Sequence, residues 1–275
     1  MRDPTADQFL AAMIRAALWL WLFVGVASLV LVCVCAEENA QDGRDVPSGV
    51  NHADHLENDS TGAQIFSVVI KGVADRKKFE EIRKEIWIHA REWVASAAVL
   101  WVLSELTEKR ERLPEEMREL DFLVMPMVNP DGYEYTRARR STRLWRKNRA
   151  PVSSACAGVD VNRNFEHGWG GHGTSGEACR DTYRGPRPAS ERETQAIVNY
   201  AAKNIPKIQG FLTFHCYGQY ILYPWGYDKI LPEDHADLQR VGEIAAQRIK
   251  EVGDVNYTVG SSANLLYPAA GKHIV

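Results

Sequence analysis

A histidine and a glutamate lie three positions apart where an apolar segment runs into a predicted helix. These residues are His89 and Glu92, and residues at this spacing on a helix share one face, so both side chains can point at one metal ion. An imidazole nitrogen and a carboxylate oxygen are a common pair of zinc ligands, and a catalytic zinc needs one further protein ligand and an open position. The pair alone does not establish a metal site, because any two such residues can fall at this spacing.

A third candidate ligand lies far downstream, at the end of a predicted strand. Residues 210–217 are rich in β-forming side chains and are expected to form a buried strand with His215 near its end. In an open α/β sheet, ligands bind at the carboxyl ends of strands. His89, Glu92 and His215 would then bind one Zn²⁺ per chain. The alternative is two hydrogen-bonded core histidines and a surface glutamate, and for each residue taken singly that alternative is favoured.

Further motifs accompany these segments and reverse that balance. They are I-H-A-R-E-W at 88–93, N-P-D-G-Y at 129–133, R-L-W-R-K-N-R at 143–149, G-V-D-V-N-R-N-F at 158–165 and Y-P-W-G-Y at 223–227. Their order and spacing closely resemble the zinc metallocarboxypeptidases of the digestive carboxypeptidase A/B type, over residues 66–271. The resemblance implies a hydrolase that releases single C-terminal residues from peptides and proteins.

The resemblance also implies roles for single residues. His89, Glu92 and His215 match the zinc ligands of the family. Arg146 matches the arginine that polarises the scissile carbonyl and stabilises its oxyanion, and a fixed positive group suits that role. Arg91 matches a further arginine that binds substrate.

Three residues match the family's binding site for the free C-terminal carboxylate of the substrate: Asn162, Arg163 and Tyr267. We refer to them below as the carboxylate clamp. An exopeptidase must recognise a terminal carboxylate, and a planar guanidinium does so through a bidentate, charge-assisted pair.

Of the five cysteines, Cys33 and Cys35 lie in the N-terminal apolar segment and the other three lie in the predicted catalytic domain. Cys156 and Cys179 match a disulfide of the family, which would contribute about 3 kcal/mol in the chain-entropy model. The alternative is two free thiols in a reducing compartment, and a secretory route favours the disulfide. Cys216 follows His215 and is expected to be a small buried side chain, because the ligand set is already complete.

The predicted elements indicate an α/β fold. Strands are expected at 66–70, 85–88, 122–127 and 210–217, and helices at 93–110, 190–203 and 238–252 with Gly253 as the last stop. Alternation of strands and helices is typical of layered α/β domains. With the resemblance, this predicts a mixed, mostly parallel twisted sheet flanked by helices, without the last strands and helix of the family.

Three regions are expected along the chain: a signal peptide or signal anchor at 1–36, a polar linker or pro-region remnant at 37–64, and an incomplete catalytic domain at 65–275. Either N-terminal alternative places the catalytic domain outside the cytosol, as a secreted or membrane-anchored protein. The balance of 33 basic and 36 acidic residues argues against a nucleic-acid binder, despite the basic run at 137–149. We expect a monomer.

The chain departs from the family in two places. Trp87 stands where the family usually has glycine, and a few residues are missing around it. The sequence also stops soon after Tyr267, before the strand that carries the family's general-base glutamate. An alternative is therefore a non-catalytic relative that binds zinc and peptide C-termini. A cytosolic amidohydrolase with the same ligands is disfavoured by the clamp. Ungapped matching places Ile274 at the floor of the side-chain pocket, which predicts a preference for apolar C-terminal residues.

Overall fold

The computed structural model describes residues 28–33, 52–58, 64–70, 88–113, 122–204 and 210–272. In chain order, the elements are β1 (Ser28–Cys33), β2 (His52–Asn58), β3 (Gln64–Ile70), α3 (Trp93–Glu108), the 3₁₀ helix η2 (Arg110–Arg112), β4 (Phe122–Met127), α5 (Pro130–Ala138), the 3₁₀ helices η3 (Arg140–Thr142) and η4 (Val161–Arg163), α6 (Arg192–Asn204), β5 (Gly210–His215), β6 (Tyr220–Tyr223), α7 (His235–Gly253), β7 (Thr258–Ser261) and α8 (Ser262–Leu265).

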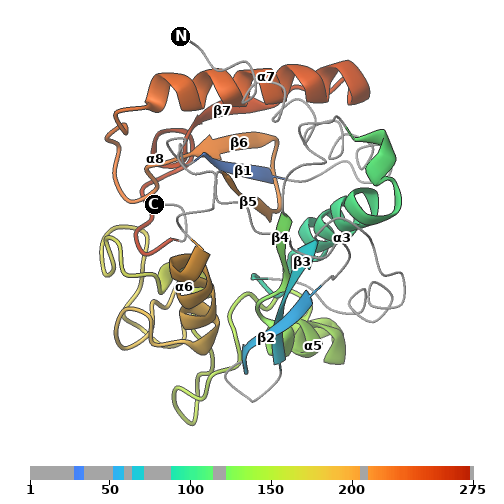
Figure 1. The fold of residues 1–275 in the computed structure, drawn as a ribbon. Coiled ribbons are helices and arrows are strands. Elements are labelled where there is room, and N and C mark those ends of the chain that lie inside the picture. The colour runs from blue at the N-terminus through green and yellow to red at the C-terminus, as the bar shows by residue number, and fades with distance from the viewer. Residues whose placement is uncertain are drawn as a thin grey trace.

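The described strands form two sheets (Figure 1). The first has the order β5-β1-β6-β7, in which β1 is antiparallel to β5 and parallel to β6, and β6 is parallel to β7. The second has the order β2-β3-β4 and is antiparallel throughout. Helices accompany both sheets, so the predicted α/β class is confirmed.

Helix α7 covers one face of the first sheet (Figure 1). Its residues Val241, Ala245 and Ile249 follow one another at intervals of four and pack with Ile221 of β6 in one buried cluster. This spacing gives a helix one apolar stripe, and burial of that stripe holds the helix on the sheet. The helix ends at Gly253, as predicted, but the left-handed residue that closes it is Asp254, at φ 52°.

The predicted elements agree with the structure to within a few residues at their ends. The strand predicted at 122–127 is confirmed as β4, and β5 ends at His215 rather than at 217. Helix α3 begins at Trp93, as predicted, and ends two residues early. The strand predicted at 85–88 lies outside the described residues except for Ile88, which lies in a bend.

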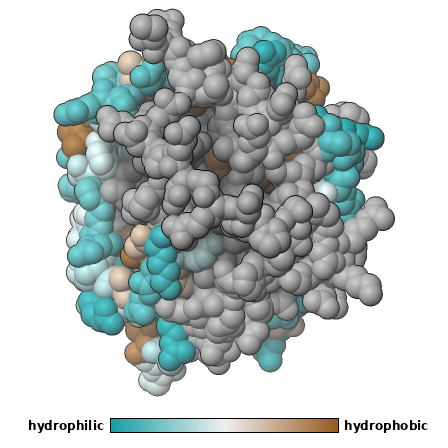
Figure 2. Space-filling model, in the orientation of Figure 1, coloured by the Kyte–Doolittle hydropathy of each residue, from teal (hydrophilic) through white to brown (hydrophobic). Residues whose placement is uncertain are grey.

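The described part of the predicted signal segment is a strand. Residues 28–33 form β1, between β5 and β6, and removal of residues 1–36 as a signal peptide would take this strand out of the sheet. The signal peptide or anchor therefore stays a prediction. None of the described helices is both long and apolar enough to cross a membrane. On the face shown in Figure 2, the surface coloured by hydropathy is mostly hydrophilic, with small separate hydrophobic patches.

Candidate metal centre and carboxylate-binding site

Two elements bring the three predicted metal ligands together. His215 is the last residue of β5, and His89 and Glu92 lie in the turn that leads into α3, which packs against β5. The prediction that His89 and Glu92 share a helix face is wrong. The turn is closed instead by a hydrogen bond from the Glu92 backbone N–H to the His89 carbonyl, at 3.0 Å. Glu92 is the N-cap of α3, but its side chain does not cap the helix, so its carboxylate is left for the site.

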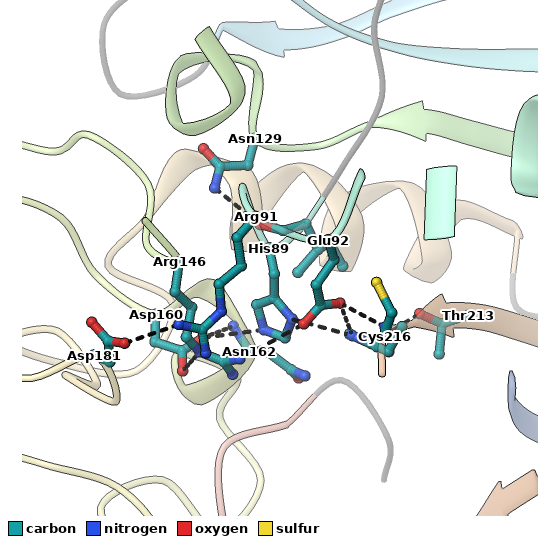
Figure 3. A network of polar contacts seen from close by, with 12 residues as sticks. His89, Arg91, Glu92, Asn129, Arg146, Asp160, Asn162, Asp181, Thr213 and Cys216 are labelled. Carbon is teal, nitrogen blue, oxygen red and sulfur yellow. Dashed lines mark hydrogen bonds and ion pairs between the residues drawn. The ribbon is translucent and has the colours of Figure 1, made fainter. Parts of the chain in front are cut away.

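The donor atoms of these three side chains converge on one point. His89 Nδ1 lies 2.7 Å from Glu92 Oε1 (Figure 3), and His215 Nδ1 lies 3.0 Å from Glu92 Oε2. The two Nδ1 atoms are 3.2 Å apart, and all three ligand atoms lie within 4.8 Å of one another. Two imidazoles and one carboxylate in this arrangement are a donor set that zinc accepts. The three predicted ligands are thus brought together as a group that could hold a metal ion.

The remaining nitrogen of each imidazole faces an oxygen atom on the outer side of the site. His215 Nε2 lies 3.3 Å from Thr213 Oγ1, and His89 Nε2 lies 3.5 Å from Asp160 Oδ1. Among the described residues, His89 Nε2 is buried without a hydrogen-bond partner, and Asp160 is its near neighbour. Outer partners of this kind fix the tautomer and orientation of metal-binding histidines. They would leave both Nδ1 atoms free for a metal.

The electrostatics of the group also suit a cation. Burial raises the pKa of Glu92, but attraction from His89 and His215 outweighs it, and the pKa ends well below its usual value. Burial lowers the pKa of His215, which favours the neutral imidazole although Glu92 opposes this. An ionised carboxylate and a neutral imidazole are the forms that bind metals. These residues therefore fit the metal that the sequence predicts.

A buried carboxylate joins the metal ligands to two arginines. Asp160 is fully buried, and its Oδ2 accepts a hydrogen bond from Arg146 Nε at 2.9 Å and lies 3.9 Å from Arg163 Nη1. Burial raises the pKa of Asp160, but Arg146 and Arg163 outweigh it and hold the pKa far below its ordinary value. Figure 3 shows Arg146, Asp160 and Asn162 on the side of His89 away from Cys216. Asp160 therefore orients groups on both sides of the site.

Arg146 is positioned between Asp160 and the metal ligands. Its Nη1 lies 3.9 Å from Glu92 Oε1, and its side chain is mostly buried. Burial lowers the pKa of Arg146, but the attraction of Asp160 and Glu92 raises it by more, so the net change in pKa is upward. The guanidinium is thus charged and fixed beside the metal group, as the predicted role requires.

The carboxylate clamp is assembled from two distant segments. Asn162 and Arg163 lie in η4, which begins where the Asp160 side chain accepts a hydrogen bond from the Asn162 backbone N–H at 3.1 Å. Arg163 is buried, and its side chain donates to the carbonyls of Gly173 at 2.9 Å and Asn162 at 2.7 Å. Burial lowers the pKa of the Arg163 guanidinium, and Tyr267, which is more than half exposed, lies close enough to raise it by a smaller amount. The predicted clamp residues are therefore placed together.

Arg91 lies at a more exposed position than the other predicted site residues. Its Nη1 pairs with Asp181 Oδ2 at 3.2 Å and donates to the Leu144 carbonyl at 3.3 Å. Nearby, Cys156 and Cys179 form the predicted disulfide. Cys216 is partly buried, and its backbone N–H donates to Glu92 Oε2 at 3.3 Å. Cys216 thus contributes to the site through its backbone N–H, which holds the Glu92 carboxylate.

The sequence did not single out Asp160 as a site residue. Asp160 lies two residues before Asn162, but its partner His89 is 71 positions away, and only the fold brings them together. Lys272 and Ser262 were missed as well. Their side chains are joined by a hydrogen bond of 3.1 Å and are buried.

Comparison with known proteins agrees with this geometry. Residues 61–274 match the family model described as zinc carboxypeptidase. The chain belongs to this family, whose metal is zinc.

Among curated relatives, rat carboxypeptidase B is 41% identical over 187 residues, which cover 66% of this chain and 45% of that protein. Human carboxypeptidase O is 41% identical over 198 residues, covering 69% of this chain and 52% of that protein. The chain thus spans about half the length of the curated relatives it matches.

Solved structures show the same fold. Bovine thrombin-activatable fibrinolysis inhibitor, in complex with tick carboxypeptidase inhibitor, matches with a TM-score of 0.68 at 31% identity, over 81% of this chain and 73% of that one. Carboxypeptidase A from Helicoverpa armigera matches with a TM-score of 0.68 at 29% identity, over 82% of this chain and 55% of that one.

Proposed function

We propose that this protein is a zinc metallocarboxypeptidase that releases single amino acids from the C-termini of peptides and proteins. One observation carries the proposal. The buried carboxylate of Asp160 contacts Arg146, near the metal group, and lies close to Arg163 of the clamp. A peptide whose terminal carboxylate binds at the clamp would therefore have its last peptide bond near the metal.

Zinc would be held by His89, Glu92 and His215, which supply two nitrogens and a carboxylate. The chemistry that a bound zinc ion supplies in such a site is polarisation of a carbonyl oxygen and a lower pKa of bound water. Asp160 and Thr213 would orient the imidazoles from the outer side, which maintains the donor geometry.

Arg146 would stabilise negative charge on the carbonyl oxygen under attack. Asp160 holds its guanidinium in place by the 2.9 Å hydrogen bond, so little reorientation is needed when the charge develops. Fixed donors aimed at a developing oxyanion are typically worth about 10²–10³ in rate each. This role requires a charged side chain, and the raised pKa of Arg146 keeps it charged.

The clamp would restrict cleavage to the last residue. Arg163, Asn162 and Tyr267 are placed to pair with a free terminal carboxylate, which a guanidinium binds in a bidentate manner. An amide in the interior of a chain offers no such charge. Arg91, at the exposed edge, would bind substrate further from the reacting bond.

We further propose that the protein acts outside the cytosol as a monomer. The Cys156–Cys179 disulfide supports an oxidising compartment.

Metal content and turnover, measured on one preparation, test the proposed function. We expect one zinc per chain, together with release of the last residue from at least one of three peptides that end in phenylalanine, lysine or glutamate. A chelator should abolish release, and added zinc should restore it. Zinc without turnover would instead support the non-catalytic relative, and failure to bind zinc would overturn both.

The His215→Ala variant removes one of the three proposed metal ligands. It should lose metal and turnover together. His235→Ala is the control, because His235 is exposed at the start of α7 and belongs to no metal group among the described residues.

A further inference from the structure

Lys272 is a buried lysine whose charge has no partner among the described residues. It is 8% exposed, and its Nζ donates a hydrogen bond to Ser262 Oγ at 3.1 Å. Ser262 is fully buried, and a hydroxyl cannot neutralise an ammonium. Buried charges in proteins are normally paired, because removing them from water is costly. The charge of the Lys272 ammonium is therefore left to be neutralised, and an anionic group of a ligand could do this.

The backbone of Lys272 is tied to the clamp. The preceding residue, Gly271, has φ +66°, and a Cβ added there would lie 2.4 Å from the Arg163 carbonyl oxygen. The Gly271 carbonyl accepts a hydrogen bond from the Phe165 backbone N–H at 3.0 Å. The chain thus passes directly against the end of η4, which fixes where the Lys272 side chain starts.

The ammonium itself also lies beside the clamp. Lys272 Nζ is 5.6 Å from the centroid of the Tyr267 ring, and Tyr267 is 55% exposed. A ligand that enters past Tyr267 would therefore come close to this ammonium. Burial lowers the pKa of Lys272 to about 7, and repulsion by Arg163 and Arg146 adds to this. Asp160 opposes the shift, but it is already engaged by Arg146.

A substrate with an acidic last residue has two carboxylates within one residue. The clamp accounts for the α-carboxylate, which leaves the side-chain carboxylate to be matched by another cation nearby. Lys272 is such a cation, and Ser262 adds a hydroxyl that can donate to the same group. An apolar or basic side chain would leave the buried ammonium unpaired or would repel it.

We propose that Lys272 and Ser262 form the polar end of the subsite for the C-terminal side chain, so that the enzyme prefers glutamate or aspartate as the residue it releases. This inference rests on the proposed carboxypeptidase function and names its substrate class. It replaces the expectation of an apolar floor, which was based on Ile274, a residue outside the described ranges. The group that decides specificity is then Lys272.

The test compares three peptides that differ only in the last residue: Ala-Ala-Glu, Ala-Ala-Gln and Ala-Ala-Phe. Glutamine has the shape of glutamate without its charge, so the ratio of kcat/KM for Glu over Gln isolates the charge. A charge-assisted hydrogen bond corresponds to a factor of about 10–100. We expect the wild type to favour Glu over Gln by about this factor, and Lys272→Met to bring the ratio to one or below while it leaves the Gln peptide within a few-fold.

Two further variants separate specificity from structure. Lys272→Arg keeps the charge and should restore part of the preference for Glu. Lys250→Met removes an exposed lysine of α7 and should leave the ratio unchanged. A thermal melt of Lys272→Met shows whether the variant is folded. If it is not folded, the Lys272→Arg variant and the wild-type ratio still decide the question.

If Lys272→Met lowers kcat/KM equally for all three peptides, Lys272 acts on the α-carboxylate or on the fold, and the inference is overturned. A wild type that prefers Phe would overturn it too. Binding of the same peptides, measured by calorimetry, separates this inference from the proposed function. If no peptide is cleaved but Glu still binds more tightly than Gln through Lys272, only the proposed catalysis fails. If neither cleavage nor binding depends on the last side chain, the inference fails.

Discussion

Replacement of Asp160 by asparagine tests how the metal ligands and the clamp depend on one buried carboxylate. In the folded protein, this group accepts hydrogen bonds from Arg146 at 2.9 Å and from the Asn162 backbone N–H at 3.1 Å, and lies 3.5 Å from His89 Nε2. Asparagine keeps the shape but removes the nearer charge partner of the buried Arg146 guanidinium, because Glu92 Oε1 lies farther away, at 3.9 Å. Removing one member of a buried ion pair typically costs about 3–5 kcal/mol.

The same substitution should weaken metal binding. Loss of an outer partner of a metal-binding histidine typically lowers metal affinity by about 10–100-fold. Zinc affinity can be measured by competition with a chelating dye, and the free energy of unfolding by urea denaturation of the metal-free protein. We expect both losses in Asp160→Asn. Asp181→Asn is the control, because Asp181 pairs with Arg91 at an exposed position, where an ion pair is worth at most about 1 kcal/mol.

The pH dependence gives a second check on Asp160. Its pKa in the folded state lies far below the unfolded value near 3.9, so its contribution is fully present above that value. As the pH falls through the acid range, the unfolded state takes up a proton first and the contribution declines. The stability difference between wild type and Asp160→Asn should therefore be constant from pH 5 to pH 8 and shrink below about pH 4. Unchanged zinc affinity, with a stability loss below about 1 kcal/mol, would refute the role given to Asp160.

Three further predictions follow from single contacts. The pKa of Lys272 in the folded state is about 7, below the ordinary 10.5, so the charged lysine destabilises the fold by up to about 5 kcal/mol below pH 7, and this cost is removed as the pH rises from 7 to 10.5. Lys272→Met should therefore be more stable than the wild type at pH 6. A wild-type stability that does not rise relative to the variant between pH 7 and pH 10 would contradict this. The Cys156→Ser/Cys179→Ser variant should lose about 3 kcal/mol in urea denaturation, and an unchanged midpoint would show that the cross-link does not stabilise the fold. Arg91→Ala should leave the metal content at one zinc per chain and raise KM, whereas loss of zinc would place Arg91 in the metal centre.

The local pattern of residues predicted the elements that present the metal ligands. The run of β-forming residues ending in His215 and the start of α3 at Trp93 are confirmed, because each depends on side chains close in sequence. The turn that joins His89 to Glu92 was expected to be helical. A spacing of three residues is compatible with a helix and with a turn, so sequence spacing alone does not separate the two.

The partners of the buried charges could not be predicted in this way. Asp160 meets Arg146 and His89 only after η4 and the turn before α3 fold against each other. Lys272 and Ser262 are only ten positions apart, but the chain just before Lys272 is placed by the close approach of Gly271 to the Arg163 carbonyl. The motifs of the resemblance contain the residues that were assigned roles, and Lys272 lies in none of these motifs, so the sequence carried no such signal for it.

The most direct test of the account compares two peptides of one sequence, one with a free C-terminal carboxylate and one with a C-terminal amide, on the zinc-loaded protein. Release of the last amino acid is measured by chromatography. We expect release from the free acid only, and loss of that release in Arg163→Met. Equal cleavage of both peptides, or cleavage at interior bonds, would contradict the assignment of a zinc carboxypeptidase.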